Sequence, residues 1–368
     1  MRCLWVLFLS VLLTGPTSAA PGALSLEQFW REPVTVGASP GHPLTAHSCG
    51  NCHAPQYRAW VHSLHARALD AGVRAQLIAS QAYPAWVAGC LSCHGPAAQA
   101  ADRKARRAVD CASCHVRQRR RFGPPLKRYL QAGARVHHGF RAEPWFLGSQ
   151  YCAVCHQFHR GGTRLQGVLL ENTYHEWRAS AYARRGVTCQ ACHMSGGQHH
   201  FEGIHDAPMV RRALHWSWTS VRGHRRVRLR LTATNVGAGH DVPTYTTARI
   251  DIRISQTCGG APCPGSRMAW ELGRKISLNL QHQYYDTRLA PGHTAVFDYD
   301  RPCQAGARSL EMRVRVRPDA AYVRFFREYL TYNVLPAETR RLAARALWRD
   351  QHSAYILWSQ KLRLRCHH

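Results

Sequence analysis

Five pentapeptides of the form Cys-x-x-Cys-His hold the residues whose types and spacing are best suited to chemistry. The paired cysteines are Cys49 and Cys52, Cys90 and Cys93, Cys111 and Cys114, Cys152 and Cys155, and Cys189 and Cys192, and the histidines that follow them are His53, His94, His115, His156 and His193. Two thiols at this spacing lie on one side of a helical turn, and each can form a thioether to a haem vinyl group. The adjacent histidine can bind the iron from one face. The pattern predicts five covalently attached haem c groups.

Two other uses of paired cysteines fit the chain less well. A zinc site takes four ligands from two neighbouring pairs and needs no histidine directly after each pair. A thioredoxin-like redox motif occurs once, within a strand–helix–strand unit. Five copies, each completed by its histidine, favour haem attachment over both alternatives.

An iron that is six-coordinate needs a second protein ligand, and the composition favours histidine for this role. The chain has 24 histidines but only five methionines, and a second histidine gives a haem a lower potential than a methionine does. The predicted second ligands are His65, His138, His200, His205 and His240. Two choices stay open, because His137 adjoins His138 and His199 adjoins His200.

The first 19 residues have the pattern of a secretory signal peptide. A basic start precedes an apolar run from Leu4 to Leu13, which is too short for a stable membrane span, and small residues lead to an expected cleavage after Ala19. We therefore expect a periplasmic or extracellular protein. In such an oxidising compartment, one or two disulfides are expected, with the pairing left open. The four cysteines available for them are Cys258, Cys263, Cys303 and Cys366.

The chain is strongly basic, with 49 Lys and Arg against 21 Asp and Glu and a formal net charge of +28. Five haems with ionised propionates would offset roughly five of these charges. Outside the cytoplasm, such a surface suits redox partner proteins that are acidic or membrane-bound, and no nucleic acid partner is expected. A solvated basic surface without a partner is the alternative, and the run from Arg117 to Arg121 is interpreted in that way.

The sequence predicts an α+β chain whose first part, residues 20–206, is a helical and loop-rich domain with five haems. Apolar spacing predicts one helix of about four turns over residues 55–69, and motifs two and three are close enough in sequence for neighbouring haems. The pattern Tyr57-x-x-Trp60-x-x-Ser63 returns 117 residues later, which suggests two related halves. Tyr182 then stands where the first copy has His65.

Beyond residue 206 the hydrophobic period changes from helical to alternating. Alternation over residues 227–233, 250–254, 276–280 and 310–317 predicts an antiparallel β-sandwich within residues 207–319. Residues 320–368 are predicted to form a C-terminal helical segment, with its last basic part reaching about Leu362.

Several of these stretches resemble the cytochrome c-554 type of multihaem cytochrome, which is distantly related to hydroxylamine oxidoreductase. The resemblance is carried by residues 49–66, 89–96 and 176–194, and by the loops at 237–244 and 286–292. It implies haems with two histidine ligands, a stacked haem array and electron transfer. It also implies that His65, the His199–His200 pair and His240 are second ligands. Many members have Gly after the Pro-Thr of the first loop, where this chain has Tyr245.

Three functions are compatible with the sequence. The first is an electron carrier between redox partners, with every iron six-coordinate. The second is an enzyme acting on small nitrogen or sulfur compounds, which needs one iron with an open position and nearby acid–base groups. The third is a subunit of an extracellular filament of cytochromes. The electron carrier is the main prediction, and no catalytic residue is assigned.

Overall fold

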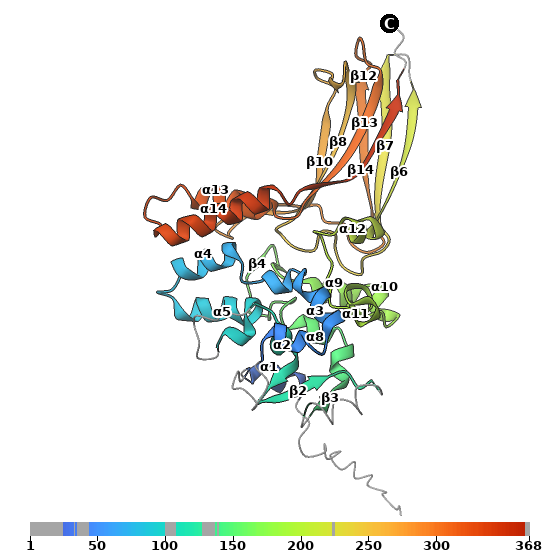
Figure 1. Cartoon of the computed structure of the whole chain (residues 1–368). Helices are drawn as coiled ribbons and strands as arrows, with labels where there is room; N and C mark the ends of the chain where they lie inside the picture. The colour runs from blue at the N-terminus through green and yellow to red at the C-terminus, as the bar shows by residue number, and fades with distance from the viewer. Residues whose placement is uncertain are drawn as a thin grey trace, which may run out of the picture.

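The computed structural model describes residues 25–32, 34, 44–99, 108–126, 137, 140–222 and 225–364. The chain has mixed α and β structure, with a region of short helices and loops followed by an antiparallel β-sandwich (Figure 1). The predicted signal peptide at residues 1–19 and the candidate ligand His138 lie outside the described residues. None of the described helices combines the length and hydropathy needed to cross a bilayer.

The first region is built from short helices, and most motifs lie at a helix end. The motif-bearing helices are α2 (Ala46–Gly50), α5 (Pro84–His94), α6 (Cys111–His115), α8 (Gln150–Ala153) and α11 (Cys189–His193). The other helices are α1 (Leu26–Arg31), α3 (Ala54–Val61), η1 (His65–Arg67), α4 (Ala71–Ala79), η2 (Pro96–Gln99), η3 (Pro144–Leu147), α9 (Thr173–Ala179), α10 (Ala181–Arg184) and η4 (Ser195–Gly197). Small β-ladders join β1 (Val116–Arg117) to β2 (Arg120–Gly123), β2 to β3 (Arg141–Ala142), and β4 (Arg164–Leu165) to β5 (Val168–Leu169).

The single helix predicted over residues 55–69 is wrong, because the chain breaks after α3. The hydroxyl of Ser63, which is 4% exposed, accepts a hydrogen bond from the backbone N–H of Ala66. A short 3₁₀ turn, η1, follows and begins at His65. A serine that bonds nearby backbone in this way competes with the helix ladder. The break turns His65 away from the direction that a continuous helix would impose.

The internal repeat has a structural counterpart in two tryptophan hydrogen bonds. The indole N–H of Trp60 donates to the carbonyl of Val109, and that of Trp177 donates to the carbonyl of Val187, at 2.8 and 2.9 Å. Each valine lies two residues before a motif, the third and the fifth. The two tryptophans therefore hold equivalent motif helices, which supports two related halves.

Arg117 departs from the solvated basic run predicted for residues 117–121. Its side chain is 1% exposed and donates to the carbonyls of Phe29, Ser113 and Val116. The guanidinium also lies 4.2 Å from the ring centroid of Phe29. Carbonyl oxygens and an aromatic face replace water around this charge. Through these contacts, Arg117 links α1 to the helix of the third motif.

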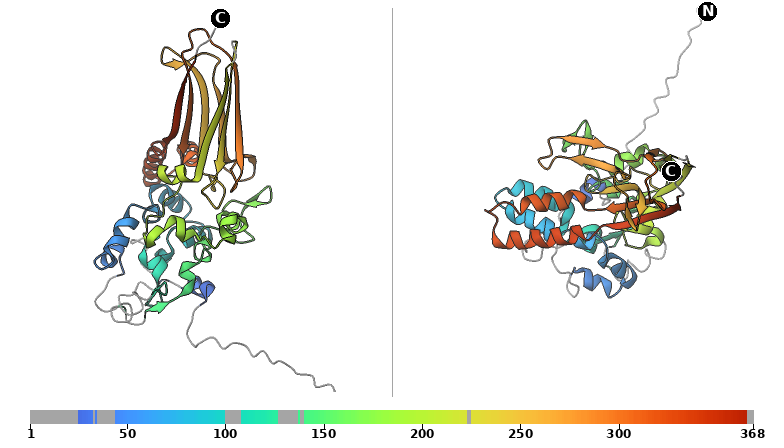
Figure 2. Two further views of the ribbon diagram at one scale, coloured as in Figure 1. Left: turned by 90° about the vertical axis from the view of Figure 1, so that its right-hand side faces the viewer. Right: turned by 90° about the horizontal axis from the view of Figure 1, so that it is seen from above.

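Two antiparallel sheets form the β-sandwich (Figures 1 and 2). One has the order β11-β10-β8-β13-β14, with β9 paired to β8, and the other has the order β12-β7-β6. The strands are β6 (Leu214–Arg222), β7 (Arg226–Asn235), β8 (Arg249–Cys258), β9 (Ala261–Pro262), β10 (Met268–Ile276), β11 (Gln283–Asp286), β12 (Thr294–Pro302), β13 (Ser309–Arg317) and β14 (Tyr355–Arg363). Helix α12 (Ala207–Ala213) precedes β6 at the domain junction.

Alternating side chains of β7, β8 and β13 form one buried core between the two sheets. It includes Leu231, Ile252 and Val314, each fully buried. The strand predicted at residues 276–280 is misplaced, because β10 ends at Ile276 and Leu280 is 44% exposed in the following turn. The apolar residues at 278 and 280 matched a period of two without belonging to a strand.

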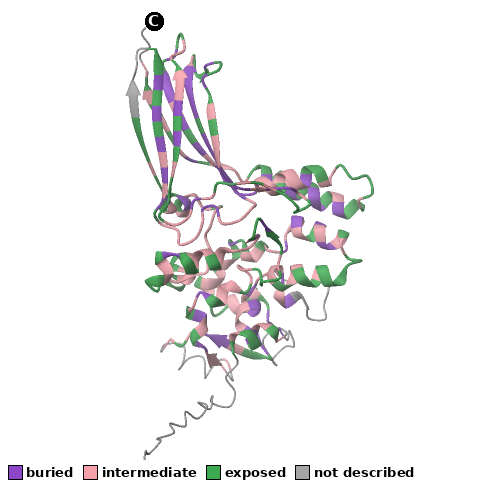
Figure 3. Ribbon diagram, turned by 180° about the vertical axis from the view of Figure 1, so that it is seen from behind, coloured by how far each residue is buried: buried purple, intermediate pink, exposed green. Residues whose placement is uncertain are grey.

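The C-terminal segment is only partly helical. Helices α13 (Ala320–Tyr329) and α14 (Ala337–Gln351) pack on α4 of the first region, with Phe326, Ala346 and Ala75 in their shared core. Buried positions lie along these helices (Figure 3). The chain then returns to the sandwich as β14, which pairs with β13, so the prediction of a helical segment over residues 320–368 is wrong beyond Gln351. Of the four extra cysteines, Cys258 and Cys263 are bridged to each other, and Cys303 is also disulfide-bonded.

Candidate functional site

One connected cavity contains every residue of the five motifs that was predicted to bind haem. It has a volume of roughly 3370 Å³, and its lining includes all ten paired cysteines and all five following histidines. A pocket for a single small molecule occupies about 300–1,000 Å³. The volume and the repeated thiol–imidazole sets therefore fit several large cofactors held side by side rather than one.

Backbone carbonyls orient most of the motif histidines. The Nδ1 atoms of His94, His115 and His193 lie 3.0, 2.9 and 2.6 Å from the carbonyl oxygens of Ala68, Phe122 and Glu202. A carbonyl only accepts hydrogen bonds, so it keeps the proton on Nδ1 and leaves the Nε2 lone pair for a metal. Each of these imidazoles is thus held in the tautomer that a haem iron requires.

Burial keeps several imidazoles of the cavity neutral, those of His65, His115 and His156 above all. It lowers the pKa of His115 and of His156 to about 4, and that of His65 to about 3. Neighbouring imidazoles lower these pKa values further. Metal binding needs the neutral form of histidine, so these three imidazoles are in the form that can bind a metal.

Four of the five motif histidines face a second imidazole across the cavity. The pairs are His53 with His137 (ring centroids 5.9 Å apart), His115 with His199 (6.2 Å), His156 with His65 (6.2 Å) and His193 with His240 (6.2 Å). An imidazole nitrogen binds a metal at about 2 Å and lies roughly 1 Å from its ring centroid, so two rings on one metal have centroids about 6 Å apart. All four separations match one iron between two rings.

The structure brings only some of the predicted second ligands to these positions. His65 and His240 each face a motif histidine. Of the adjacent histidines, His199 rather than His200 faces His115, and His200 is exposed. His137 faces His53, while its neighbour His138 lies outside the described residues.

His205 is engaged elsewhere, so its place in the predicted ligand set is not supported. Its Nε2 lies 2.9 Å from Oδ2 of Asp319, at the start of α13. This contact joins the haem region to the C-terminal helices. Adjacency to the fifth motif was the only sequence signal for His205, and adjacency does not fix which side of the chain a side chain faces.

His94 differs from the other motif histidines. In the part of the chain that the structure describes, no second imidazole faces it at the distance found in the four pairs. Near this motif, beside Cys93, lies Glu171, whose pKa burial raises to about 8, with a further upward contribution from Glu176. A carboxyl that can hold a proton near neutral pH therefore lies beside the second motif.

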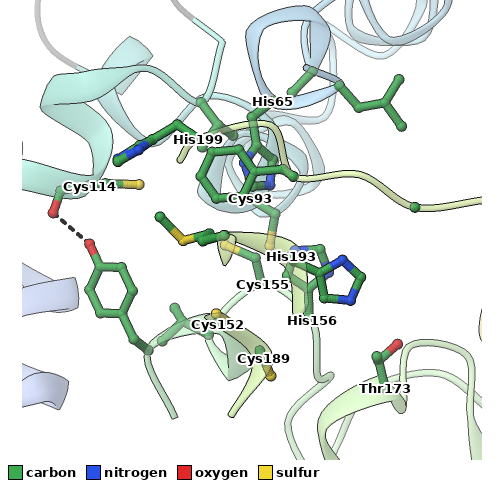
Figure 4. Close-up of a pocket in the computed structure, with 18 of the residues that line it drawn as sticks. His65, Cys93, Cys114, Cys152, Cys155, His156, Thr173, Cys189, His193 and His199 are labelled. Carbon is green, nitrogen blue, oxygen red and sulfur yellow. Dashed lines mark hydrogen bonds between the residues drawn. The ribbon is translucent and has the colours of Figure 1, made fainter. Parts of the chain in front are cut away.

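Interactions between cysteines show which motifs are neighbours in space. The thiol of Cys93 lies within interaction range of the thiol of Cys155, and the thiol of Cys152 lies within range of that of Cys189. Figure 4 shows these four cysteines together in the cavity. In a haem-loaded protein their sulfur atoms are thioether sulfurs, so motifs two and four, and motifs four and five, hold adjacent groups. Cys49 and Cys111 join motifs one and three in the same way. These interactions link each motif to another. Motifs two and three, which sequence proximity suggests as neighbours, have no such cysteine pair among the described residues, but Cys90 and Ala108 pack in the same cluster.

A loop of the sandwich reaches into the cavity and carries His240. Tyr182 donates to the carbonyl of Val236 at 2.6 Å, and a Cβ on Gly239 would lie 3.2 Å from Tyr182 Cβ, so the loop passes too close for a larger residue. Below it, Arg288 and Glu176 form an ion pair at 2.7 Å with side chains 4% and 7% exposed. The tyrosine that replaces a histidine in the second repeat thus supports the loop bearing His240.

Comparison with known proteins agrees with this geometry. Residues 48–118, which include the first three motifs, match the family described as cytochrome c554 and c-prime. With this match and its five attachment motifs, the chain has the features of a multihaem c-type cytochrome. No curated protein matches the sequence. Among solved structures, the cytochrome resembles a penta-haem cytochrome c552 from Thermochromatium tepidum, with a TM-score of 0.59 and 19% identity over 90% of this chain and 100% of that one.

The residues of this cytochrome fit haem c. Its paired thiols can form the covalent attachments, the histidine after each pair can supply one axial nitrogen, and the facing imidazoles can supply a second. Bound haem contributes an iron that changes between ferric and ferrous states. The chain contributes ligand identity, ligand orientation and shielding from water, which together set the potential of each iron.

Sequence reasoning overlooked one residue beside the ligands. The phenol of Tyr245, from the same sandwich loop, hydrogen-bonds Nδ1 of His156. The sequence showed Tyr245 at a position where many cytochromes of the resembled type have Gly. This residue could not be connected to His156, 89 residues away, without the tertiary structure.

Proposed function

We propose that this cytochrome is an exported protein with five haems that carries electrons along a closely spaced array between redox partners. The observation that carries the proposal is the set of four imidazole pairs, each separated by the distance that one iron requires, within a single cavity. Two histidine ligands leave an iron without an open position for substrate. Four such sites suit the transfer of electrons rather than chemistry on a bound molecule.

The arrangement of the attachment cysteines supports an array of neighbouring haems. Neighbouring cysteines group motifs one and three, and motifs two, four and five. Tyr151, which lies next to motif four, donates to the carbonyl of Cys114 at 2.5 Å, so motif three lies beside motif four and links the two groups. Haems attached at neighbouring cysteines would lie side by side, so electrons could pass between them without a diffusing carrier. The formal charge of +28 is proposed to draw in an acidic or membrane-bound partner from the periplasm or the cell exterior.

Mass spectrometry of the exported, intact cytochrome tests the number of haems. We expect the mass of the processed chain plus five haem groups, with one haem on each peptide that contains a paired-cysteine motif. A redox titration is expected to reduce all five without added substrate. A smaller number of haems, or a subset that no electron donor reduces, would contradict an array of five.

The environment of His94 favours a second candidate, an oxidoreductase with one open iron. No imidazole faces His94 among the described residues, and the Glu171 carboxyl lies near its attachment cysteine. A small nitrogen or sulfur compound could bind such an iron and receive a proton from this carboxyl. Electron paramagnetic resonance (EPR) of the oxidised protein discriminates: a high-spin signal equal to one haem favours the enzyme, and five low-spin signals favour the carrier.

A further inference from the structure

His156 is oriented differently from the other motif histidines whose Nδ1 contacts the structure describes. Those of His94, His115 and His193 are bonded to backbone carbonyls, as are those of the facing His199 and His240. His156 instead bonds the side-chain oxygen of Tyr245. A backbone carbonyl cannot be changed by substitution, whereas a phenol can be removed, weakened or replaced.

The direction of this hydrogen bond follows from the role of His156. Because Nε2 must present its lone pair to a metal, Nδ1 carries the proton and donates it to the Tyr245 oxygen. The phenol proton then needs its own acceptor, and Tyr245 hydrogen-bonds the hydroxyl of Thr173. Thr173 in turn donates to the carboxyl of Glu171 at 2.8 Å. With Thr173 donating to Glu171, the three donors point the same way, from the imidazole toward the carboxyl, and such chains polarise their members. The Thr173 hydroxyl also lies 2.8 Å from the hydroxyl of Thr244.

We propose that Tyr245 is a positioning residue that sets how strongly His156 donates electrons to its haem, and so sets the potential of that one site. This inference rests on the proposed haem ligation by His156. An acceptor on Nδ1–H makes an imidazole more basic, which stabilises the ferric iron and lowers the potential. The loop bearing His240 therefore serves two sites, as the source of a facing imidazole for His193 and of an oxygen for His156.

The test is the substitution Tyr245→Phe in the haem-loaded, full-length cytochrome. Phenylalanine keeps the ring and removes the oxygen, so His156 loses its acceptor. We expect one of the midpoint potentials to move upward while the others stay in place, and the g-values of one low-spin EPR signal to change with it. Both measurements report the ligand field and not the activity of the protein.

Tyr355→Phe is the matched control. It removes a hydroxyl that also bridges the two domains, by donating to the carbonyl of Ile204 at 2.8 Å. It touches no motif histidine, so the midpoints should not move. Thr173→Val is a second variant, which leaves Tyr245 in place and removes the acceptor of its proton. A smaller shift of the same midpoint in the same direction is expected, because the phenol oxygen becomes a weaker acceptor.

The outcomes separate this inference from the proposed function. If the wild-type peptide with Cys152 and Cys155 carries no haem, the proposed function fails. If it carries haem but Tyr245→Phe and Thr173→Val leave every midpoint and g-value unchanged, the assignment of Tyr245 is overturned. An equal shift in Tyr355→Phe would also overturn it, since the cause would then be a loosened domain contact rather than the lost hydrogen bond.

Discussion

The imidazole rings of His193 and His240 face each other at a centroid distance of 6.2 Å, with their planes 15° from parallel. His193 ends the helix of the fifth motif, and His240 comes from a loop of the β-sandwich. One iron between them would be held by both domains at once. The sandwich therefore contributes a residue to the candidate haem site and does not only cover it.

Replacing His240 is expected to open one coordination position. In His240→Ala the iron bound by His193 loses its second ligand, so oxidised protein should gain a high-spin EPR signal equal to one haem. His282→Ala, which removes an exposed histidine from a turn of the same sandwich, is the control and should leave the spectrum unchanged. An unaltered low-spin spectrum in His240→Ala would show that His240 is not a ligand.

His199 and His200 form a matched pair of variants. His199→Ala removes the ring that lies 6.2 Å from His115, so one high-spin signal and a higher midpoint for that haem are expected. His200→Ala removes its exposed neighbour and should preserve the wild-type spectrum. A high-spin signal in His200→Ala, with an unchanged spectrum in His199→Ala, would mean that His200 and not His199 faces the third motif.

The ion pair between Arg288 and Glu176 is expected to stabilise the domain junction. Breaking a buried pair on one side typically costs about 3–5 kcal/mol, because the remaining charge stays buried without its partner. Arg288→Met should lower the free energy of unfolding of the haem-loaded protein by about that amount. The control is Arg230→Gln, which removes an exposed pair with Asp298 and should not move the denaturation midpoint. If both variants lowered the free energy of unfolding by the same amount, burial of the Arg288–Glu176 pair would not explain its contribution to stability.

Glu171 predicts a specific pH dependence of stability. Burial raises its pKa from the ordinary 4.5 to about 8, while Thr173 hydrogen bonds act against the rise and Glu176 adds to it. The folded state therefore binds a proton more tightly than the unfolded state, so stability contributed by this group is lost as pH rises from about 4.5 to 8. Glu171→Gln should flatten the fall in melting temperature over this range. Glu328→Gln, at an exposed position on α13, should keep the wild-type slope.

In protein made without haem attachment, we expect the sandwich to fold and the haem region to stay unfolded. The sandwich has a continuous buried core that includes Ile252 and Val314, whereas the buried clusters of the haem region are small and surround the large cavity. Without haem, that cavity cannot be filled by the side chains around it. Circular dichroism should show retained β-structure and a lost helical signal. A single cooperative melt with native helical content would contradict this expectation.

The haem-attachment motifs, the α+β class and the presence of a sandwich were all readable from the sequence, because each depends on local spacing. Two thiols and a histidine within five residues define an attachment site wherever the chain runs, and alternation along a strand such as β7 reports one buried face. The same local spacing can occur in two different kinds of secondary structure, and there it led to wrong predictions. The residues at 276–280 alternate without forming a strand, and residues 355–363 form β14 where helix was predicted.

Only the tertiary structure decided which imidazole faces which. His199 and His200 are adjacent and chemically identical, and the choice between them depends on the direction in which the chain enters the cavity. The partner of His193 lies in another domain, and the acceptor for His156 is Tyr245, 89 residues along the chain. Residue types set what each group can bind, but distances between remote segments arise only when the packed domains bring them together.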